Sequence, residues 1–462
     1  MNPQVVVIGG GISGLACAYR LWQLGVPVTL LEAHDIAGGL IGTVERDGFL
    51  FETGPQSFQG TDSVLDLVRE LGLEVDLCQA DPRAPRYVVR HGRLEKLPMS
   101  PQAVLRSSLL GMGARWKIAS EALRKTKPPT DEESVAQFVR RKFGHEILEY
   151  LVAPFVSGVY AGDPEKLSLR AAFPSLEEWE RTYGSVLRGA MKSRPAKGAG
   201  QAHPPLCSFH HGMAMLTRTM AAKLGESARL SAHVDRLTRN DRDELARYQI
   251  HFTQNDKAET LEAPAVVIAT PAYTASHLVS SFAAPLARSL SGIAYAGMVV
   301  VGAAYHAKQV GAVMDGFGVL IPRSEKYRTL GIVWNSSLFP DRGAEGRTIL
   351  TSMIGGATDP EIVEKPEQEI LAVAQDESAR LLAITGQPIF SRAWKHPKAL
   401  PQYNLGHGHT VEAVRESERA TPGLYFVGNY LEGPSIGKCI DRGSQVAEAA
   451  RAYLRDGMAK SA

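Results

Sequence analysis

Apolar residues are most regularly spaced at the start of the chain. Residues 5–8 form an uninterrupted apolar run, and residues 28–31 form a second one that ends at Glu32. The segment between them begins with three glycines and continues with helix-like, amphipathic spacing. The pattern predicts a β-strand, a tight glycine turn, an α-helix and a second β-strand, in that order.

The spacing of the glycines gives this unit its candidate chemistry. Gly9, Gly11 and Gly14 form the pattern G-x-G-x-x-G, and Glu32 lies 18 residues after the last of them. The first glycine allows the turn, the second lets the backbone approach a pyrophosphate, and the third lets the helix pack close to the strand. The helix N-terminus offers N–H groups to phosphates, and the acid accepts hydrogen bonds from a ribose hydroxyl. We interpret the segment as a dinucleotide-binding fingerprint.

Helical spacing recurs in three later segments. Residues 61–72 predict a helix that ends at a glycine, and residues 100–180 are mostly helical. Within the second segment, a helix start is expected after two prolines, with Thr130 or Asp131 as its N-cap. Residues 360–385 also predict a helix.

Strand-like runs fill much of the rest. Residues 84–97 predict a β-hairpin. Four further runs are separated by turns rather than by helices: Ala296–Tyr305, Phe317–Ile321, Thr329–Trp334 and Thr348–Ile354. This connection pattern predicts an antiparallel sheet.

Two late segments are expected to return to the first unit. Residues 265–269 are an apolar strand, and residues 423–427 are a second one followed by a glycine-rich loop. A final helix is predicted near residues 444–454, whereas residues 193–205 predict a mobile loop.

At 462 residues the chain is too long for a single core. We predict an α/β fold with a discontinuous Rossmann-type nucleotide-binding domain, an antiparallel-sheet substrate domain and a helical insertion. The predicted order is nucleotide-binding residues 1–82, a substrate-domain hairpin at 83–97, the helical insertion at 98–205, nucleotide-binding residues 206–275, the substrate domain at 276–415 and nucleotide-binding residues 416–462.

Composition excludes several classes of function. The chain has 44% hydrophobic and 22% charged residues, and its net charge of +2 gives no reason to expect a nucleic-acid partner. The four cysteines show no metal-ligand spacing, so we expect no metal site and a reducing compartment. No apolar run is long enough for a membrane span, and the chain starts directly with the first strand, so we expect a cytoplasmic protein.

Four short runs outside the fingerprint narrow the interpretation. They are Phe51-Glu-Thr-Gly-Pro55, Gly158-Val-Tyr-Ala-Gly-Asp163, Pro401-Gln-Tyr-Asn-Leu-Gly-His407 and Gly428-Asn-Tyr-Leu-Glu-Gly433. With the fingerprint, they resemble the oxygen-dependent protoporphyrinogen oxidases of haem biosynthesis, in the amine oxidase superfamily of flavoproteins, from residue 4 to about residue 450. The resemblance implies non-covalent FAD that oxidises a porphyrinogen to a porphyrin. Six electrons would leave in two-electron steps, with oxygen as acceptor and hydrogen peroxide as product.

The resemblance also implies which residues contact the cofactor, and no catalytic residue beyond the flavin. The implied FAD contacts are Gly9, Gly10, Gly11, Ile12, Ser13, Gly14, Glu32, Ala33, Gly39, Leu40, Gly54, Pro55, Gln56, Ser57, Val234, Gly428, Asn429, Ser435, Ile436 and Gly437.

A porphyrinogen is a broad apolar macrocycle with anionic propionates, so it needs a flat apolar cleft and a cation at its edge. The residues that the resemblance implies are Arg86 at a propionate, Gly158 at a point of close approach, and Phe317, Leu320, Val333 and Met353 along the macrocycle. On the pattern alone, the arginine would be a surface charge and the apolar residues would be sheet core.

Alternatives remain at the level of substrate and of function. Coproporphyrinogen, with four propionates, is the alternative to protoporphyrinogen, and Arg86 favours the latter. An amine oxidase, a carotenoid desaturase or a flavin-binding protein without turnover are the rival functions.

Residues 101–127 mix apolar with basic side chains. Such a stretch is typical of peripheral contact with the inner face of a cell membrane, and an ordinary surface helix is the alternative. A homodimer is also compatible with the resemblance.

Overall fold

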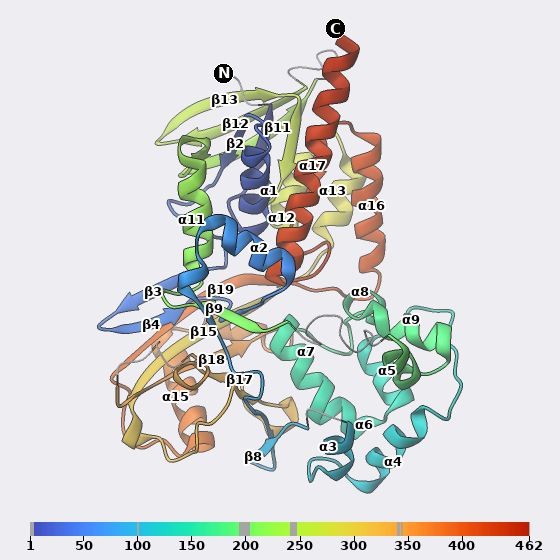
Figure 1. Ribbon diagram of the computed structural model, residues 1–462, viewed down its shortest axis with the longest axis vertical. Coiled ribbons are helices and arrows are strands. Elements are labelled where there is room, and N and C mark those ends of the chain that lie inside the picture. Colours follow the sequence, from blue (N-terminus) through green and yellow to red (C-terminus); the bar gives the residue numbers. More distant parts are fainter. Residues whose placement is uncertain are drawn as a thin grey trace.

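A parallel sheet gathers segments from both ends of the chain (Figure 1). The structure, a computed structural model, describes residues 4–98, 101–193, 204–240, 247–339, 342 and 345–461. Among these residues, five strands form the sheet in the order β10-β2-β1-β14-β20. Their bounds are β1 Val5–Ile8, β2 Val28–Leu31, β10 Ala228–Arg229, β14 Ala265–Ile268 and β20 Leu424–Phe426. The sheet is therefore assembled discontinuously, as the returning segments predicted.

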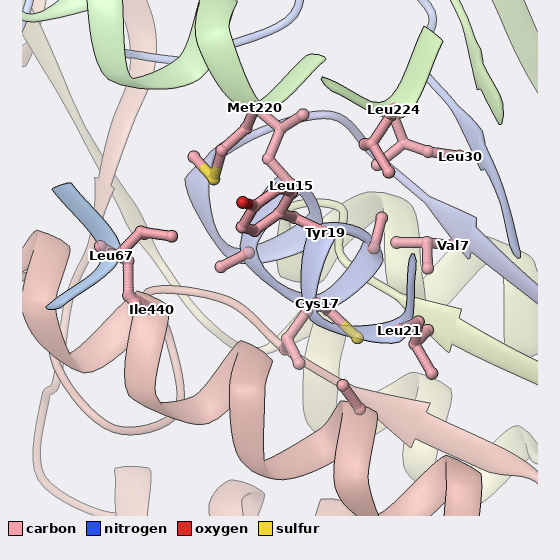
Figure 2. Close-up of a cluster of buried hydrophobic side chains, with 14 of the residues drawn as sticks. Val7, Leu15, Cys17, Tyr19, Leu21, Leu30, Leu67, Met220, Leu224 and Ile440 are labelled. Carbon is pink, nitrogen blue, oxygen red and sulfur yellow. The ribbon is translucent and has the colours of Figure 1, made fainter. Parts of the chain in front are cut away.

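Four helices cover one face of this sheet and build its core. They are α1 Ile12–Gln23, α2 Asp62–Leu71, α11 Ala214–Leu224 and α17 Ile436–Ser461. The side chains that pack together between them include Leu15, Tyr19, Leu67, Met220 and Ile440 (Figure 2). A Cβ on Gly443 of α17 would lie 2.7 Å from the carbonyl oxygen of Ser13, so this glycine lets α17 lie directly on α1.

The opposite face of the parallel sheet is covered as well. The elements on this side are α12 Ala272–Val279, α13 Ala284–Ser291, α16 His407–Ala420, and the antiparallel strands β11 Ala232–Arg239, β12 Tyr248–Gln254 and β13 Lys257–Ala263. Val5 and Val7 of β1 point to the first layer, and Val6 and Ile8 point to the second. Burial on both faces explains why β1 is apolar without alternation.

A second large sheet builds the predicted substrate domain. In the described part of the chain it has seven strands, in the order β19-β15-β18-β17-β16-β7-β8. Their bounds are β7 Arg86–Arg90, β8 Arg93–Lys96, β15 Tyr295–His306, β16 Gly318–Leu320, β17 Thr329–Trp334, β18 Arg347–Gly355 and β19 Phe390–Pro401. The predicted hairpin and the four predicted runs are all present. The sheet is mixed rather than wholly antiparallel, because the hairpin joins β16 through a parallel β7.

Helix α15, Glu367–Leu382, covers the back of this sheet. Its residues Leu381 and Leu382 pack with Val319 and Trp334 of the strands. The predicted helix at residues 360–385 is thus mostly α15, preceded by a short 3₁₀ turn. On the other face, Ala304 and Ile349 pack with Phe49 and Phe51, and Val88 packs with the insertion.

The insertion is helical, as predicted. Its helices are α3 Pro101–Arg106, α4 Met112–Glu121, α5 Val135–Lys142, α6 His145–Ile147, α7 Ala153–Tyr160, α8 Leu169–Ala172, α9 Pro174–Tyr183 and α10 Val186–Lys192. The expected N-cap at Thr130 or Asp131 was wrong, because α5 starts after Ser134. The Ser134 hydroxyl accepts from Gln137 N at 3.2 Å, and the Gln137 amide oxygen accepts from Ser134 N at 2.8 Å. This reciprocal capping box outcompetes the earlier candidates.

A π-helical turn, Leu148–Val152, joins α6 to α7. Pro154 follows it, and because proline has no backbone N–H it cannot complete the α-helical ladder at this point. Arg90 of β7 fixes the turn to the substrate sheet. Its guanidinium lies 5.0 Å from the centre of the Tyr150 ring and donates to Glu146 Oε1 at 3.1 Å. The position of α7 is therefore tied to β7.

Shorter elements complete the fold. They are β3 Thr43–Arg46, β4 Phe49–Glu52, β5 Phe58–Gln59, β6 Leu77–Gln79, β9 Leu206–Phe209 and α14 Asn335–Leu338. No described helix combines the length and the apolar character that crossing a membrane requires. The loop predicted at 193–205 lies mostly outside the described residues, and the domain boundaries stay predictions.

Ala383 offers a test of helix termination. It ends α15 in the left-handed conformation, with φ 49° and ψ 44°. The left-handed conformation destabilises a residue that has a Cβ by about 1–2 kcal/mol, and it does not destabilise glycine. We therefore expect Ala383→Gly to raise the free energy of unfolding by about 1 kcal/mol. Ala372→Gly, at an exposed position inside the same helix, should lower it by about 1 kcal/mol. Urea unfolding of both variants checks the opposite signs, and two losses would contradict the prediction.

Candidate active site

The glycine turn after β1 excludes side chains where α1 meets the strands. A Cβ on Gly14 would lie 1.9 Å from Gly9 O, and one on Gly9 would lie 2.9 Å from the carbonyl carbon of Ala269. Gly9 also has a φ of +109°, which favours glycine. A Cβ on Gly11, in contrast, would meet no atom of the described residues within 4 Å. Gly11 thus faces open space, as a pyrophosphate cradle requires.

Glu32 is buried at the end of β2 and is held by the turn itself. Its Oε2 accepts from Gly10 N at 2.6 Å, and its Oε1 accepts from His34 N at 2.9 Å. Each carboxylate oxygen has a further lone pair, so a ribose hydroxyl can still donate to it.

Four other predicted cofactor residues border this turn. Ile12 opens α1 half-buried, and the buried Ser13 follows it. Ala33 is exposed directly after β2. The N–H of Ala232 donates to Glu32 O at 2.8 Å, and this contact fixes the start of β11, on which Val234 lies two residues further along.

The second glycine pair lies against the first turn. Gly38 N donates to Gly10 O at 2.8 Å, and a Cβ on Gly39 would lie 3.2 Å from Gly11 Cα. A Cβ on Gly54 would lie 1.9 Å from the carbonyl oxygen of Leu40. Three backbone segments therefore converge without intervening side chains, and the structure brings these predicted residues together.

Gln56 uses its side chain inside the protein. Its Nε2 donates to Gly54 O at 2.9 Å, and its Oε1 accepts from Asn335 Nδ2 at 2.8 Å. Asn335 Oδ1 in turn accepts from Thr351 Oγ1 at 2.8 Å. This buried relay ties the loop after β4 to α14 and β18, while Pro55 and Ser57 are half-buried beside it.

Glu52, at the end of β4, anchors the same loop. It is fully buried and accepts from Thr43 Oγ1 at 2.6 Å, from Met213 N at 2.9 Å and from Arg342 Nη2 at 2.7 Å. Burial raises the pKa of this carboxyl, and the charge of Arg342 opposes the rise. These contacts hold the end of β4 to β3 and to the start of α11.

The loop after β20 presents backbone donors. Its carbonyls are engaged: Gly428 O accepts from Leu431 N at 3.2 Å, and Asn429 O accepts from a tyrosine hydroxyl. Among the described residues, the N–H groups of Gly428, Asn429 and Tyr430 have no hydrogen-bond acceptor. Gly428 and Tyr430 are buried. Because buried N–H groups are rarely left unpaired, a bound group that accepts hydrogen bonds fits here.

The start of α17 follows the loop after β20 and carries three more predicted cofactor residues. Ser435 is exposed, Ile436 is buried and Gly437 is half-buried. A Cβ on Gly437 would be 3.4 Å from Thr61 Oγ1 just before α2. The first N–H groups of a helix attract negative charge, so these residues suit the polar side of a cofactor.

One rung of the substrate sheet carries two of the predicted substrate residues, and a third, Phe317, directly precedes the rung's central glycine. Arg86 pairs with Gly318, and Gly318 pairs with Val333. The Arg86 guanidinium lies 5.4 Å from the centre of the Phe317 ring. Arg86 is exposed, and the two apolar side chains are half-buried.

The next rung whose side chains point to the same face carries two more, Leu320 and Met353. Leu320 pairs with Gly331, and Gly331 pairs with Met353. A Cβ on Gly158 of α7 would lie 2.9 Å from Leu320 Cδ2. Strand residues two apart point to one face, so both rungs form a single wall that α7 approaches at Gly158.

The sequence interpretation missed contributors to this wall and to the cofactor loop. Gly318 and Gly331 keep the wall flat, and glycine inside strand-like runs was the available signal. Tyr403 and His407 hold the loop after β20, but their run indicated only a family resemblance.

Comparison with known proteins decides the family. A family model described as flavin containing amine oxidoreductase matches residues 12–451. This chain belongs to that family. A chloroplastic protoporphyrinogen oxidase of Nicotiana tabacum is 34% identical, over 97% of this chain and 85% of the relative. A coproporphyrinogen III oxidase of Bacillus subtilis is 28% identical, over 98% of this chain and 99% of the relative.

A solved structure agrees with the fold of this flavin-containing amine oxidoreductase. The crystal structure, provisionally assigned to a protoporphyrinogen oxidase of Exiguobacterium sp. 255-15, superposes with a TM-score of 0.82 at 22% identity, over 98% of this chain and 99% of the other. The predicted α/β fold and the predicted family resemblance are both confirmed.

FAD is the cofactor of this flavin-containing amine oxidoreductase, as the family implies. The open space at Gly11, the buried Glu32 carboxylate and the N–H groups of residues 428–430, which lack acceptors in the described part of the chain, would suit the pyrophosphate, a ribose hydroxyl and further hydrogen-bond acceptors of FAD. In the described part of the chain, no group of histidine, cysteine and acidic residues could hold a metal ion.

Gly11 tests this cofactor site. Its φ of −70° and the free space around it mean that Gly11→Ala should fold normally. The added methyl would occupy the approach to the pyrophosphate, so we expect FAD affinity to fall at least about tenfold, which is about 1.4 kcal/mol. Titration of the apoprotein with FAD measures this. Gly113→Ala, also in open space but on α4, should bind FAD like the wild type, and equal affinities of all three proteins would contradict the site.

Proposed function

We propose that this chain oxidises protoporphyrinogen IX to protoporphyrin IX in tetrapyrrole synthesis. Bound FAD supplies the redox chemistry, taking six electrons as two-electron hydride transfers and passing them to oxygen to give hydrogen peroxide. The names of the relatives from Nicotiana tabacum and Bacillus subtilis both support a porphyrinogen as substrate.

The wall of the substrate sheet supports this proposal most directly. It is flat at two glycines, apolar over its half-buried surface and positively charged at one edge through Arg86. A porphyrinogen has the same distribution, with an apolar ring and carboxylates on its rim. The wall would therefore bind the macrocycle face-on and the guanidinium would pair with a propionate.

Orientation, rather than proton transfer, is the task of the residues around the substrate. A porphyrinogen loses hydride from a carbon between electron-rich pyrroles, and the resulting cation loses one proton to water, so no paired acid and base is needed. Gly158 would admit the ring close to the cofactor, since a side chain there would collide with Leu320. Phe317, Val333 and Met353 would exclude water from the reacting face.

Substrate choice depends on the rim. We favour protoporphyrinogen over coproporphyrinogen because Arg86 is placed to pair with a single propionate at this edge of the wall, where it also stacks on Phe317. An amine oxidase or a desaturase would have no use for an exposed guanidinium beside this wall, and a flavin-binding protein without turnover would not need the wall at all.

Arg86 gives the decisive test. Oxidation of protoporphyrinogen and of coproporphyrinogen is followed in parallel by porphyrin fluorescence in air. We expect the wild type to prefer protoporphyrinogen, and Arg86→Ala to raise KM about 10- to 100-fold, because a charge-assisted hydrogen bond contributes about 1.5–3 kcal/mol.

Arg93→Ala is the matched control, because Arg93 is an exposed arginine on the other strand of the same hairpin. It should leave KM unchanged. A preference for coproporphyrinogen would contradict protoporphyrinogen as the substrate but not porphyrinogen oxidation. Absence of fluorescence with both substrates would contradict the proposed function.

The insertion carries a surface that suits a membrane. Met112 and Trp116 lie one turn apart on α4 and are 85% and 64% exposed, and Leu123 just beyond is 85% exposed. The Arg124 guanidinium lies 5.1 Å from the centre of the Trp116 ring. Exposed apolar side chains beside basic ones favour an anionic lipid surface. We propose a cytoplasmic enzyme that touches the inner face of the membrane here.

Sedimentation with anionic vesicles tests this contact. We expect part of the wild type to sediment at low salt and less at high salt, because charge attraction is screened. Trp116→Ser should sediment less, whereas Trp22→Ser, which changes an exposed tryptophan on α1, should behave like the wild type. Complete recovery of the wild type in the supernatant at low salt would contradict membrane contact.

A further inference from the structure

Three successive carbonyls after β20 are each held by a defined donor. Gly428 O is held within the turn by Leu431 N. Asn429 O accepts from the hydroxyl of Tyr403, and Tyr430 O accepts from His407 Nε2 at 2.9 Å. Tyr403 comes from the segment between β19 and α16, and His407 is the first residue of α16.

Tyr403 and His407 act as one unit, which we name the Tyr–His clamp. Their rings stack at 4.5 Å between centres, with 21° between planes. Both side chains are buried, and burial lowers the pKa of the His407 imidazole. A neutral imidazole carries one proton, and because a carbonyl only accepts, that proton is on Nε2. The clamp thus offers two fixed donors.

The helical insertion holds the clamp from behind. Ser168 N donates to Tyr403 O at 2.8 Å, and Gly406 N donates to Glu132 Oε2 at 2.7 Å. The Ser168 hydroxyl also donates to Glu132. The clamp cannot shift without breaking contacts to the insertion.

Holding a carbonyl also sets the direction of the adjoining N–H. In a trans peptide the C=O and the following N–H point in opposite directions. With Gly428 O and Asn429 O engaged on one side, the N–H groups of Asn429 and Tyr430 point to the other. Tyr403 sets the N–H of Tyr430 directly, because it holds Asn429 O. His407 acts on the N–H of Asn429 through Leu431: it holds Tyr430 O and so orients Leu431 N, which is the donor to Gly428 O. These N–H groups have no acceptor among the residues that the structure describes.

We propose that Tyr403 and His407 are positioning residues that aim the N–H groups of Asn429 and Tyr430 at bound FAD and thereby favour its reduced, negatively charged form. The inference rests on the proposed placement of FAD beside Gly428 and Asn429. Fixed N–H donors stabilise negative charge in a buried site, and such donors tune the redox chemistry of a flavin. Loss of the clamp frees the peptides to turn and makes reduction of FAD less favourable.

The test is the two-electron midpoint potential of bound FAD, measured by photoreduction beside a reference dye, without any porphyrinogen. Tyr403→Phe keeps the ring and removes the donor, and His407→Leu removes the other donor. We expect each to lower the equilibrium constant for FAD reduction about tenfold, which for a two-electron couple is about 30 mV. His407→Gln keeps a donor at the ε position and should restore the wild-type potential.

Matched controls come from the same elements. Tyr425→Phe removes a hydroxyl from β20 that donates to Ala449 O at 3.4 Å, and His409→Gln changes an exposed histidine of α16. Both should leave the potential unchanged.

Wild-type potentials in Tyr403→Phe and in His407→Leu would overturn the proposal. A folded Tyr403→Phe protein that retained no FAD would also overturn it, because the hydroxyl would then serve binding rather than redox tuning. If His407→Leu did not fold, the isosteric Tyr403→Phe would decide. Because no porphyrinogen is used, failure of the proposed substrate would leave this result unaffected.

Discussion

The structure depends on backbone packed directly on backbone. A Cβ on Gly14 would come within 1.9 Å of Gly9 O, and one on Gly54 within 1.9 Å of Leu40 O, so no residue but glycine allows either approach. Gly38 N also donates to Gly10 O. These contacts bring the turn after β1, the loop after β2 and the loop after β4 into one place. The same absence of side chains that lets the segments meet leaves the surface at Gly11 open to a ligand. Packing and cofactor binding are therefore consequences of one constraint.

Buried polar links carry that arrangement to the rest of the molecule. The relay from Gln56 through Asn335 to Thr351 connects the glycine loops to the substrate sheet. The Tyr–His clamp connects the loop after β20 to the helical insertion. Buried hydrogen-bonded side chains are costly to leave unpaired, so each link fixes a single relative placement of two segments. The placement of the cofactor loops relative to the substrate sheet and the insertion is thereby set by specific hydrogen bonds as well as by apolar packing.

Features with a local signal could be predicted from the sequence. The glycine spacing, the apolar run of β1 and the strand-like runs of the substrate sheet all depend on residues close together, and the structure contains them. Partnerships across the chain could not be predicted. The parallel pairing of Arg86 with Gly318, the relay at Gln56 and the donors at Tyr403 and His407 depend on contacts between distant segments. Strand β19 was missed because its lysines, histidine and prolines hide a strand pattern.

The π-helical turn before α7 has a consequence for how the substrate wall can change in evolution. Such a turn holds one residue more than the α-helix around it. Removing that residue would rotate the following helix by about 100° relative to the preceding one, and a neighbour would replace Gly158 opposite Leu320. The shape of the substrate wall is thus sensitive to helix length, not only to the side chains that line it. A single-residue deletion at positions 148–152 would therefore alter the wall at α7 while leaving every side chain of the substrate sheet unchanged.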